Sequence, residues 1–209
     1  MKIAKEGFPL ILTAAGLAVL AFVMDWKIAA AILGLLALAI AAFFRDPDRE
    51  VPTGENLVVA PADGRVVSIA EIKNHASFPG AAIRLSIFLS PLDVHINRAP
   101  VSGNIEDVSY QAGKFLAAYK EEASQRNEQN SLKIVDARGR SFGVVQIAGV
   151  LARRNACRVK RGDTLARGER FGLIMFGSRT DVYLPSGCRL DVAEGHRVKG
   201  GATVLGRFV

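Results

Sequence analysis

The sequence predicts an α+β protein rich in strands: a barrel-like or sandwich β domain preceded by an N-terminal helical hairpin that associates with a membrane. Three observations support this fold class. Residues 8–44 are almost continuously apolar, whereas the rest of the 209-residue chain has a mixed composition. In that later part, short β-branched runs are separated by glycine and proline at strand-like spacing. We therefore expect two parts, a membrane hairpin over residues 1–45 and a β-rich domain over residues 46–209.

The N-terminal block consists of two uncharged segments, residues 8–24 and 28–44, separated by Asp25, Trp26 and Lys27. A helix of either length rises about 25 Å, less than the roughly 30 Å hydrocarbon core of a bilayer. Each segment is therefore a marginal span or one arm of a hairpin, with Trp26 suited to the interface. The alternatives are a secretory signal, which lacks a clear small-residue cleavage site here, and a buried core hairpin. Membrane attachment is the interpretation we favour.

Basic residues flank both ends of this block, Lys2 and Lys5 before it and Arg45 and Arg49 after it. This pattern predicts that both ends, and the domain that follows, lie on the cytoplasmic side of the cell membrane. The chain's 27 Lys and Arg outnumber its 20 Asp and Glu, which suits an anionic membrane surface. No basic run is interleaved with aromatic residues, so we do not expect a nucleic-acid partner. The two cysteines have no metal-ligand spacing, and we expect no metal.

Four runs after the block read as strands because they are short, apolar and rich in β-branched residues. In the second of them, alternate residues from Ile83 to Leu89 fall on one face, the period of a strand. A single helix is predicted over residues 113–130, and its polar second half indicates an exposed helix or a loop. The four predicted strands are residues 65–72, 82–90, 143–152 and 171–176.

Two of the three histidines, His75 and His196, lie in turn-like segments and are expected to be exposed. His95 differs because it follows a strong strand in "SPLDVHINRAP" (90–100), where Asp93, His95, Asn97 and Arg98 fall within six residues. Alternate residues of an extended chain share one face. Both a polar strand end with a satisfied histidine and a functional cluster remain open. Asp63 precedes Gly64, and Asp-Gly is a common turn pair.

The chain's only Gly-Ser pair, Gly177-Ser178, lies in "FGSRTDVYLP" (176–185). It could form a turn. It could also hold a hydrolase nucleophile, Ser178 with His95 as base, although the G-x-S-x-G elbow is missing because residues 176–180 are F-G-S-R-T. In a third interpretation the protein processes itself, and Ser178 attacks the carbonyl of Gly177. Glycine suits that position because no side chain crowds the carbonyl and strained backbone angles cost little there.

Four segments together resemble the short form of the phosphatidylserine decarboxylase proenzymes: "FFRDPDRE" (43–50), "APADGRV" (60–66), "IRLSIFLSPLDVHINRAPVSG" (83–103) and "GLIMFGSRTDVYLP" (172–185). The resemblance implies that the chain cleaves itself between Gly177 and Ser178. The large chain, 1–177, and the small chain, 178–209, would stay together as a heterodimer, with a higher oligomer left open. Ser178 would become a covalent pyruvoyl group, which forms a Schiff base with phosphatidylserine in the membrane, releases CO₂ and yields phosphatidylethanolamine.

The resemblance also implies that Ser178, His95 and Asp63 form the catalytic set. Longer members carry two histidines in the segment matching residues 93–100, whereas the second position here is Arg98. His95 would then serve both self-cleavage and decarboxylation, or Asp63 and a water would take a share. Arg98 or Arg179 could hold the lipid phosphate, with plain surface charge as the alternative. A membrane-anchored serine hydrolase and a non-catalytic binding domain remain as other functions.

Overall fold

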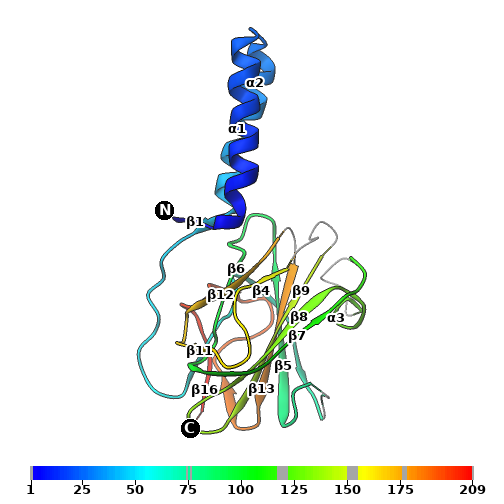
Figure 1. Cartoon of the computed structure of the whole chain (residues 1–209). Coiled ribbons are helices and arrows are strands. Elements are labelled where there is room, and N and C mark those ends of the chain that lie inside the picture. The colour runs from blue at the N-terminus through cyan, green and yellow to red at the C-terminus, as the bar shows by residue number, and fades with distance from the viewer. Residues whose placement is uncertain are drawn as a thin grey trace. The chain divides into compact units, whose positions relative to one another are not determined.

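The computed structural model (Figure 1) describes residues 2–73, 75, 77–116, 122–149, 155–175 and 178–208. The chain divides into two compact units, Met1–Asp48 and Arg49–Val209. The first is mainly helical and the second is built mainly of strands. This confirms the predicted β-rich α+β class with an apolar helical region in front.

The first unit is a hairpin of two helices, α1 (Phe8–Val23) and α2 (Lys27–Phe43). In the turn between them Asp25 has a φ of 59°, a left-handed conformation that aspartate tolerates better than most residues. At the open end, β1 (Lys2–Ile3) pairs with β2 (Arg45–Asp46). The 3-10 helix η1 (Lys5–Gly7) leads into α1. The two ends of the hairpin are therefore tied together by backbone hydrogen bonds.

Most large apolar side chains of the hairpin are exposed. Val23, Ile28 and Leu38 are 74%, 80% and 68% exposed. Soluble proteins rarely expose continuous apolar surface of this extent, so the alternative of a buried core hairpin does not describe this unit. Within the described residues, the helix Lys5–Val23 is long and apolar enough to cross a membrane, judged by length and composition, and Lys27–Phe43 is a shorter apolar helix.

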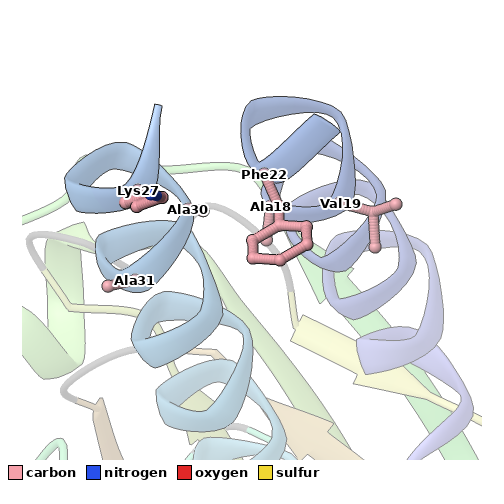
Figure 2. Close-up of a pocket in the computed structure, with 6 residues that line it drawn as sticks. All are labelled: Ala18, Val19, Phe22, Lys27, Ala30 and Ala31. Atoms are coloured by element: carbon pink, nitrogen blue, oxygen red, sulfur yellow. The ribbon is translucent and has the colours of Figure 1, made fainter. Parts of the chain in front are cut away.

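A shallow groove runs between the two helices near their turn (Figure 2). Small side chains on both helices allow the backbones to approach each other. The one charged group on its lining is the Lys27 ammonium, which lies 3.3 Å from a carboxylate oxygen of Asp25. The lining residues are Ala18, Val19 and Phe22 of α1 and Lys27, Ala30 and Ala31 of α2.

An eight-stranded antiparallel sheet, curled into a half-barrel, forms the scaffold of the second unit (Figure 1). Strand β13 lies near its middle and pairs with β5 on one side and β9 on the other. The strand that begins at Ser178 is therefore held along both edges. The order is β11 (Thr164–Leu165), β7 (Gly103–Gln111), β8 (Gln129–Val135), β9 (Ser141–Ile147), β13 (Ser178–Pro185), β5 (Ala81–Leu89), β4 (Gly64–Glu71) and β15 (Arg197–Val198).

Two three-stranded sheets complete the unit: β10 (Asn155–Cys157), β12 (Arg170–Ile174) and β6 (Ile96–Arg98) in one, and β14 (Cys188–Leu190), β16 (Val204–Phe208) and β3 (Leu57–Val59) in the other. One apolar core joins all three sheets. Leu85 and Val182 of the large sheet pack in it with Phe171 and Leu205 of the small ones, and all four are fully buried. Burying one such side chain contributes about 1.5–3 kcal/mol.

Three predicted strands are present with shifts of one or two residues: 65–72 corresponds to β4, 82–90 to β5 and 171–176 to β12, as far as these are described. The fourth, 143–152, overlaps β9 but is too long, because β9 ends at Ile147 and residues 148–149 are not in a strand. The helix predicted over residues 113–130 is wrong in the described part, because only α3 (Ala123–Arg126) is helical and β8 begins at Gln129. Residues 117–121 lie outside the description. The physical reason is the Asn127 side chain, which bonds to the backbone of Leu116 and Ala148 and so draws the chain out of a helical path.

Gly64 gives a direct test of the close contact between β4 and β5. Its φ is 153°, and a Cβ there would overlap the carbonyl oxygen of Phe88. We expect Gly64→Ala to lower the free energy of unfolding by about 3 kcal/mol, because backbone strain and overpacking add. Gly80→Ala is the control. Its φ is also positive, at 81°, but a Cβ there meets nothing within 4 Å, so strain alone should cost about 1 kcal/mol. Denaturant titration of both variants in one detergent measures the difference, and equal losses would contradict the contact argument.

Candidate active site

Ser178 is the first residue of β13, and its side chain faces the core. It pairs with Leu89 of β5, and residues at alternate positions, such as Val182, lie in the apolar cluster. Ser178 is 0% exposed, and among the described residues its Oγ has no hydrogen-bond partner. Buried hydroxyls are normally paired. The unpaired hydroxyl makes Ser178 a candidate for a chemical role.

The chain changes sheets immediately before Ser178. β12, which ends at Ile174, belongs to a three-stranded sheet, and β13 belongs to the eight-stranded one. Only residues 175–177 connect them. Gly177, the predicted cleavage position, lies outside the described residues together with Phe176. Both strands are held independently, β12 by β6 and β10 and β13 by β5 and β9. The connection is therefore a point where the chain could be cut without removing either strand from its sheet.

His95 lies just before β6 and is 0% exposed. Its Nδ1 is 3.0 Å from the carbonyl oxygen of Asp93. A carbonyl only accepts hydrogen bonds, so this contact requires a proton on Nδ1, and in the neutral ring it leaves the lone pair on Nε2. The carbonyl of His95 accepts a bond from the backbone N–H of Ile174 at 3.1 Å. The first contact sets the tautomer of the His95 ring. The second attaches the His95 backbone to the end of β12, the strand that precedes Ser178.

Asp63 lies in the bend that precedes β4, as its Asp-Gly pair predicts. One carboxylate oxygen accepts from Arg49 at 2.7 Å and the other from the backbone N–H of Gly200 at 2.8 Å. The side chain is 14% exposed. Two residues earlier, the Pro61 carbonyl accepts the backbone N–H of Arg98 at 2.8 Å. The bend that carries Asp63 is therefore attached to the strand that follows His95.

A buried network of side-chain amides, which the sequence analysis missed, connects these pieces. Asn97 of β6 donates to Thr180 Oγ1 at 3.1 Å and to the Pro61 carbonyl at 3.4 Å. Gln146 of β9 donates to Asn97 Oδ1 at 2.8 Å. Asn97, Gln146 and Thr180 are all 0% exposed. The network brings the segments that carry Asp63, His95 and Ser178 to the same end of the large sheet. One signal could have revealed it, because Gln146 is a polar residue inside an otherwise apolar strand.

The two arginines considered for phosphate binding are both buried. Arg98 is 5% exposed and donates to the carbonyl of Gly168 at 3.0 Å. Arg179 is 3% exposed and binds Asp181 in a bidentate pair, with both nitrogen–oxygen distances 2.8 Å. Residues alternate along β13, so this pair lies on the face opposite to Ser178. Both guanidinium groups have protein partners, and a phosphate role for either one stays a prediction.

The opposite face of β13 also carries aromatic residues. His75, predicted to be exposed, is only partly so and stacks against Phe78 and Tyr183, at 5.1 and 4.5 Å between ring centroids. Burial lowers the pKa of His75, and the nearby Arg84 acts in the same direction. Burial and the Asp181 carboxylate raise the pKa of Tyr183 to about 12. Both rings are therefore uncharged near pH 7, and the cluster serves packing. His196 is exposed, as predicted.

Metal-ligating clusters are not found in the part of the chain that the structure describes: no three His, Cys, Asp or Glu side chains there are arranged to hold an ion. The two cysteines are free thiols in different parts of the second unit. Burial raises the pKa of Cys157, and burial together with Asp191 raises that of Cys188 to about 11. A thiol with a raised pKa is a poor nucleophile near neutral pH, because little of it is present as thiolate. The two thiols are therefore poor candidates for a catalytic role.

Gln146 tests whether the amide network positions the site. We expect Gln146→Leu to lower the free energy of unfolding by about 1–3 kcal/mol, because Asn97 loses a buried partner. We also expect it to slow whatever reaction Ser178 undertakes. Gln129→Leu is the matched control, since Gln129 on the adjacent strand β8 makes an exposed bond to Gln111 and should change stability by about 0.5 kcal/mol or less. Denaturation curves of both variants decide this, and a Gln146→Leu protein as stable and reactive as the control would remove the network from the site.

The comparisons with known proteins agree with the predicted family. The family model for phosphatidylserine decarboxylase matches residues 36–206. Three relatives named phosphatidylserine decarboxylase proenzyme are 45% identical over 204 residues in Geotalea uraniireducens (98% of this chain, 95% of the relative), 46% over 206 in Symbiobacterium thermophilum (99% and 95%) and 49% over 184 in Gluconobacter oxydans (85% and 82%). Matches of this length and identity show that the chain belongs to the phosphatidylserine decarboxylase family.

Proposed function

We propose that this chain is a membrane-attached phosphatidylserine decarboxylase that makes its own pyruvoyl group by cutting the peptide bond between Gly177 and Ser178. The observation that carries the proposal is the Ser178 hydroxyl, which is fully buried and, among the described residues, without a hydrogen-bond partner. A hydrolase serine must be reachable from solvent. A buried serine can reach the carbonyl that precedes it in its own chain, so the geometry favours self-processing.

The cut would proceed through an ester intermediate. Ser178 Oγ attacks the Gly177 carbonyl carbon, its proton goes to a base, and the nitrogen of the former peptide bond takes up a proton as the amide becomes an ester. Removal of the Ser178 α-proton then breaks the Cβ–Oγ bond. That step leaves a carboxylate on residue 177 and a dehydroalanine at residue 178. Tautomerisation and hydrolysis by water release ammonia and leave a keto group at the new terminus.

His95 is the best-placed base in this scheme. Its Nδ1–H bond to the Asp93 carbonyl directs the Nε2 lone pair outward from that contact, and the ring is buried at the sheet end where Ser178 lies. Asp63, the acidic member of the expected catalytic set, is paired with Arg49 at 2.7 Å, and its bend is attached through the Pro61 carbonyl to the strand that follows His95. Because Arg98 replaces the second histidine of longer relatives, His95 would act in both self-cleavage and decarboxylation.

The site fits a pyruvoyl group because conversion of Ser178 removes a hydroxyl donor that has no partner in the described structure. Once formed, the group supplies a carbonyl that combines with the substrate amine and draws electrons from the bond to the departing carboxylate. The chain's own residues hold that terminus in place. Thr180, two residues after Ser178, accepts a hydrogen bond from Asn97. Strand β13, which carries both Ser178 and Thr180, is paired along both edges.

The two products would remain associated. The small chain, residues 178–209, supplies β13 between β5 and β9, β15 beside β4, and β16 beside β3. All three of these strands pair with strands of the large chain, 1–177. The association of the two chains therefore needs no covalent link. The heterodimer should therefore separate only when the fold is lost.

The membrane attachment follows from the apolar hairpin, whose exposed surface needs a lipid environment. Basic residues at its open end, with Lys2 paired to Asp48 at 3.0 Å, favour the cytoplasmic side of the cell membrane. A substrate that stays in the bilayer then needs no transport to the enzyme.

Ser178 is the first residue to test. We expect wild-type protein to give chains of about 19 and about 3.5 kDa, in proportion to its 22.4 kDa, and Ser178→Ala to stay whole because it has no attacking oxygen. The small chain should be lighter by one ammonia than a fragment that begins with serine, as intact mass spectrometry can show. Ser186→Ala, in the exposed turn after β13, is the control and should be cut normally. An uncut wild-type chain with full decarboxylase activity would refute the proposal.

His95 is the second residue to test. We expect His95→Ala to slow self-cleavage and decarboxylation by a factor of about 10²–10⁴, the usual worth of a general base. The cut is followed by gel densitometry during expression, and decarboxylation by CO₂ release from whatever cleaved protein forms. His196→Ala removes an exposed histidine from a turn and should leave both rates unchanged. Equal rates in the two variants would show that another group is the base.

A further inference from the structure

Few large apolar side chains are exposed on the second unit. Among its described residues, those more than a third exposed are Val67, Leu92, Tyr110 and Phe115. Leu92 is the extreme case, at 85% exposed. A single exposed leucine needs no explanation by itself. Its position does, because it lies three residues before the buried His95.

The register of the large sheet places three of these four at the end where Ser178 lies. Leu92 follows β5, whose last residue, Leu89, pairs with Ser178. Tyr110 pairs with Asn130 of β8, which pairs with Gln146 of β9. Phe115 comes shortly after the end of β7. Leu92, Tyr110 and Phe115 therefore lie at the same end of the large sheet as the proposed active site.

The same end is rich in exposed basic residues. Arg65 pairs with Phe88 on one side and Arg197 on the other, and both arginines are exposed, as are Lys199 and Lys114. The acidic groups nearby are largely engaged. Asp93 lies 3.3 Å from Arg197, and Asp63 is paired with Arg49. Glu128 lies beside Tyr110. Exposed apolar side chains with exposed cations at the same end of the sheet suit the surface of an anionic bilayer.

The turn that presents Leu92 is the turn that fixes His95. The Asp93 carboxylate accepts the Ser90 backbone N–H at 2.8 Å, and the Asp93 N–H donates to the Ser90 carbonyl at 2.9 Å. The Asp93 carbonyl in turn accepts from His95 Nδ1 at 3.0 Å. A rigid turn can hold an apolar side chain in place for insertion without ordering costs at the moment of binding.

We infer that residues 90–93 form an interfacial anchor that inserts Leu92 into an anionic bilayer, with Arg65, Arg197 and Lys199 on the lipid headgroups. This inference rests on the proposed function, because the anchor would serve to bring the headgroup of a membrane lipid to Ser178. It concerns the second unit alone and is a contact additional to the apolar hairpin.

A single tryptophan reports the insertion. The chain has one tryptophan, Trp26, so Trp26→Phe provides a silent background in the full chain. Leu92→Trp is then reconstituted into vesicles of phosphatidylglycerol and phosphatidylcholine with brominated acyl chains. We expect a blue-shifted emission and loss of most of its intensity. Ala137→Trp is the matched control, in the exposed turn between β8 and β9 at the opposite end of the sheet, and should stay unshifted and bright.

An activity measurement supplies the second arm. We expect Leu92→Ser to raise the KM for phosphatidylserine in vesicles about tenfold, the factor that burying most of a leucine represents. Turnover of a short-chain phosphatidylserine dissolved as monomers should be unchanged, and Leu92→Phe should restore the vesicle KM. A merely structural defect would impair both substrates and the self-cleavage seen on a gel.

The outcomes separate this inference from the proposed function. If Leu92→Trp is as water-exposed as Ala137→Trp in vesicles, the anchor is wrong, whatever the state of Ser178. If its emission shifts with protein concentration in detergent without lipid, the surface binds a second copy of the chain, and the anchor is again wrong. If the wild-type chain is uncut while Leu92→Trp is quenched by lipid, the anchor stands and the proposed catalysis fails.

Discussion

The central position of β13 is the constraint on which the rest of the second unit depends. An antiparallel strand with neighbours on both edges cannot move without breaking two ladders of hydrogen bonds at once, and Ser178 begins that strand, with Leu89 opposite it. The preceding strand, β12, is also paired on both edges, with β10 and β6, but in another sheet. Each of the two strands that flank residues 175–177 is therefore held in its own sheet. The proposed cut between Gly177 and Ser178 would leave both strands in place.

The buried amides around this junction explain how a polar site is tolerated inside an apolar core. Asn97 and Gln146 each lie where an unpaired carboxamide would cost several kcal/mol, yet each finds a partner, the nearest at 2.8 Å. The packing that permits this needs room. Gly172 on β12 provides it, because a Cβ there would lie 2.7 Å from Gln146 Nε2 and would also overlap the Ala156 carbonyl. The geometry of this network therefore depends on residues from several strands at once, including a glycine on β12.

Sequence reasoning captured what depends on local pattern. The alternation from Ile83 to Leu89 predicts β5, and the segments around Asp63, His95 and Ser178 predict the family, which the comparisons confirm. It failed where tertiary contacts decide. The Asn127 side chain, bonded to Leu116 and Ala148, overrides the helical tendency of its segment. The partnership of Asn97 with Gln146 joins residues 49 positions apart, and no periodicity in a single chain reveals such a pair. The burial of Arg98 and Arg179 could not be predicted from the sequence either, because a charged side chain is normally expected at the protein surface.

The burial of Ser178 bears on how such an enzyme could be kept inactive until it is complete. In the intact chain the Ser178 hydroxyl faces the core and is 0% exposed, so no external substrate reaches it, and under the proposed mechanism the keto group would form only after the cut. Breaking the bond at 177 would free one end of the connection while β13 keeps the other end in place. Under the proposed mechanism the reactive group would therefore form only in a chain whose two flanking strands already lie in their two different sheets.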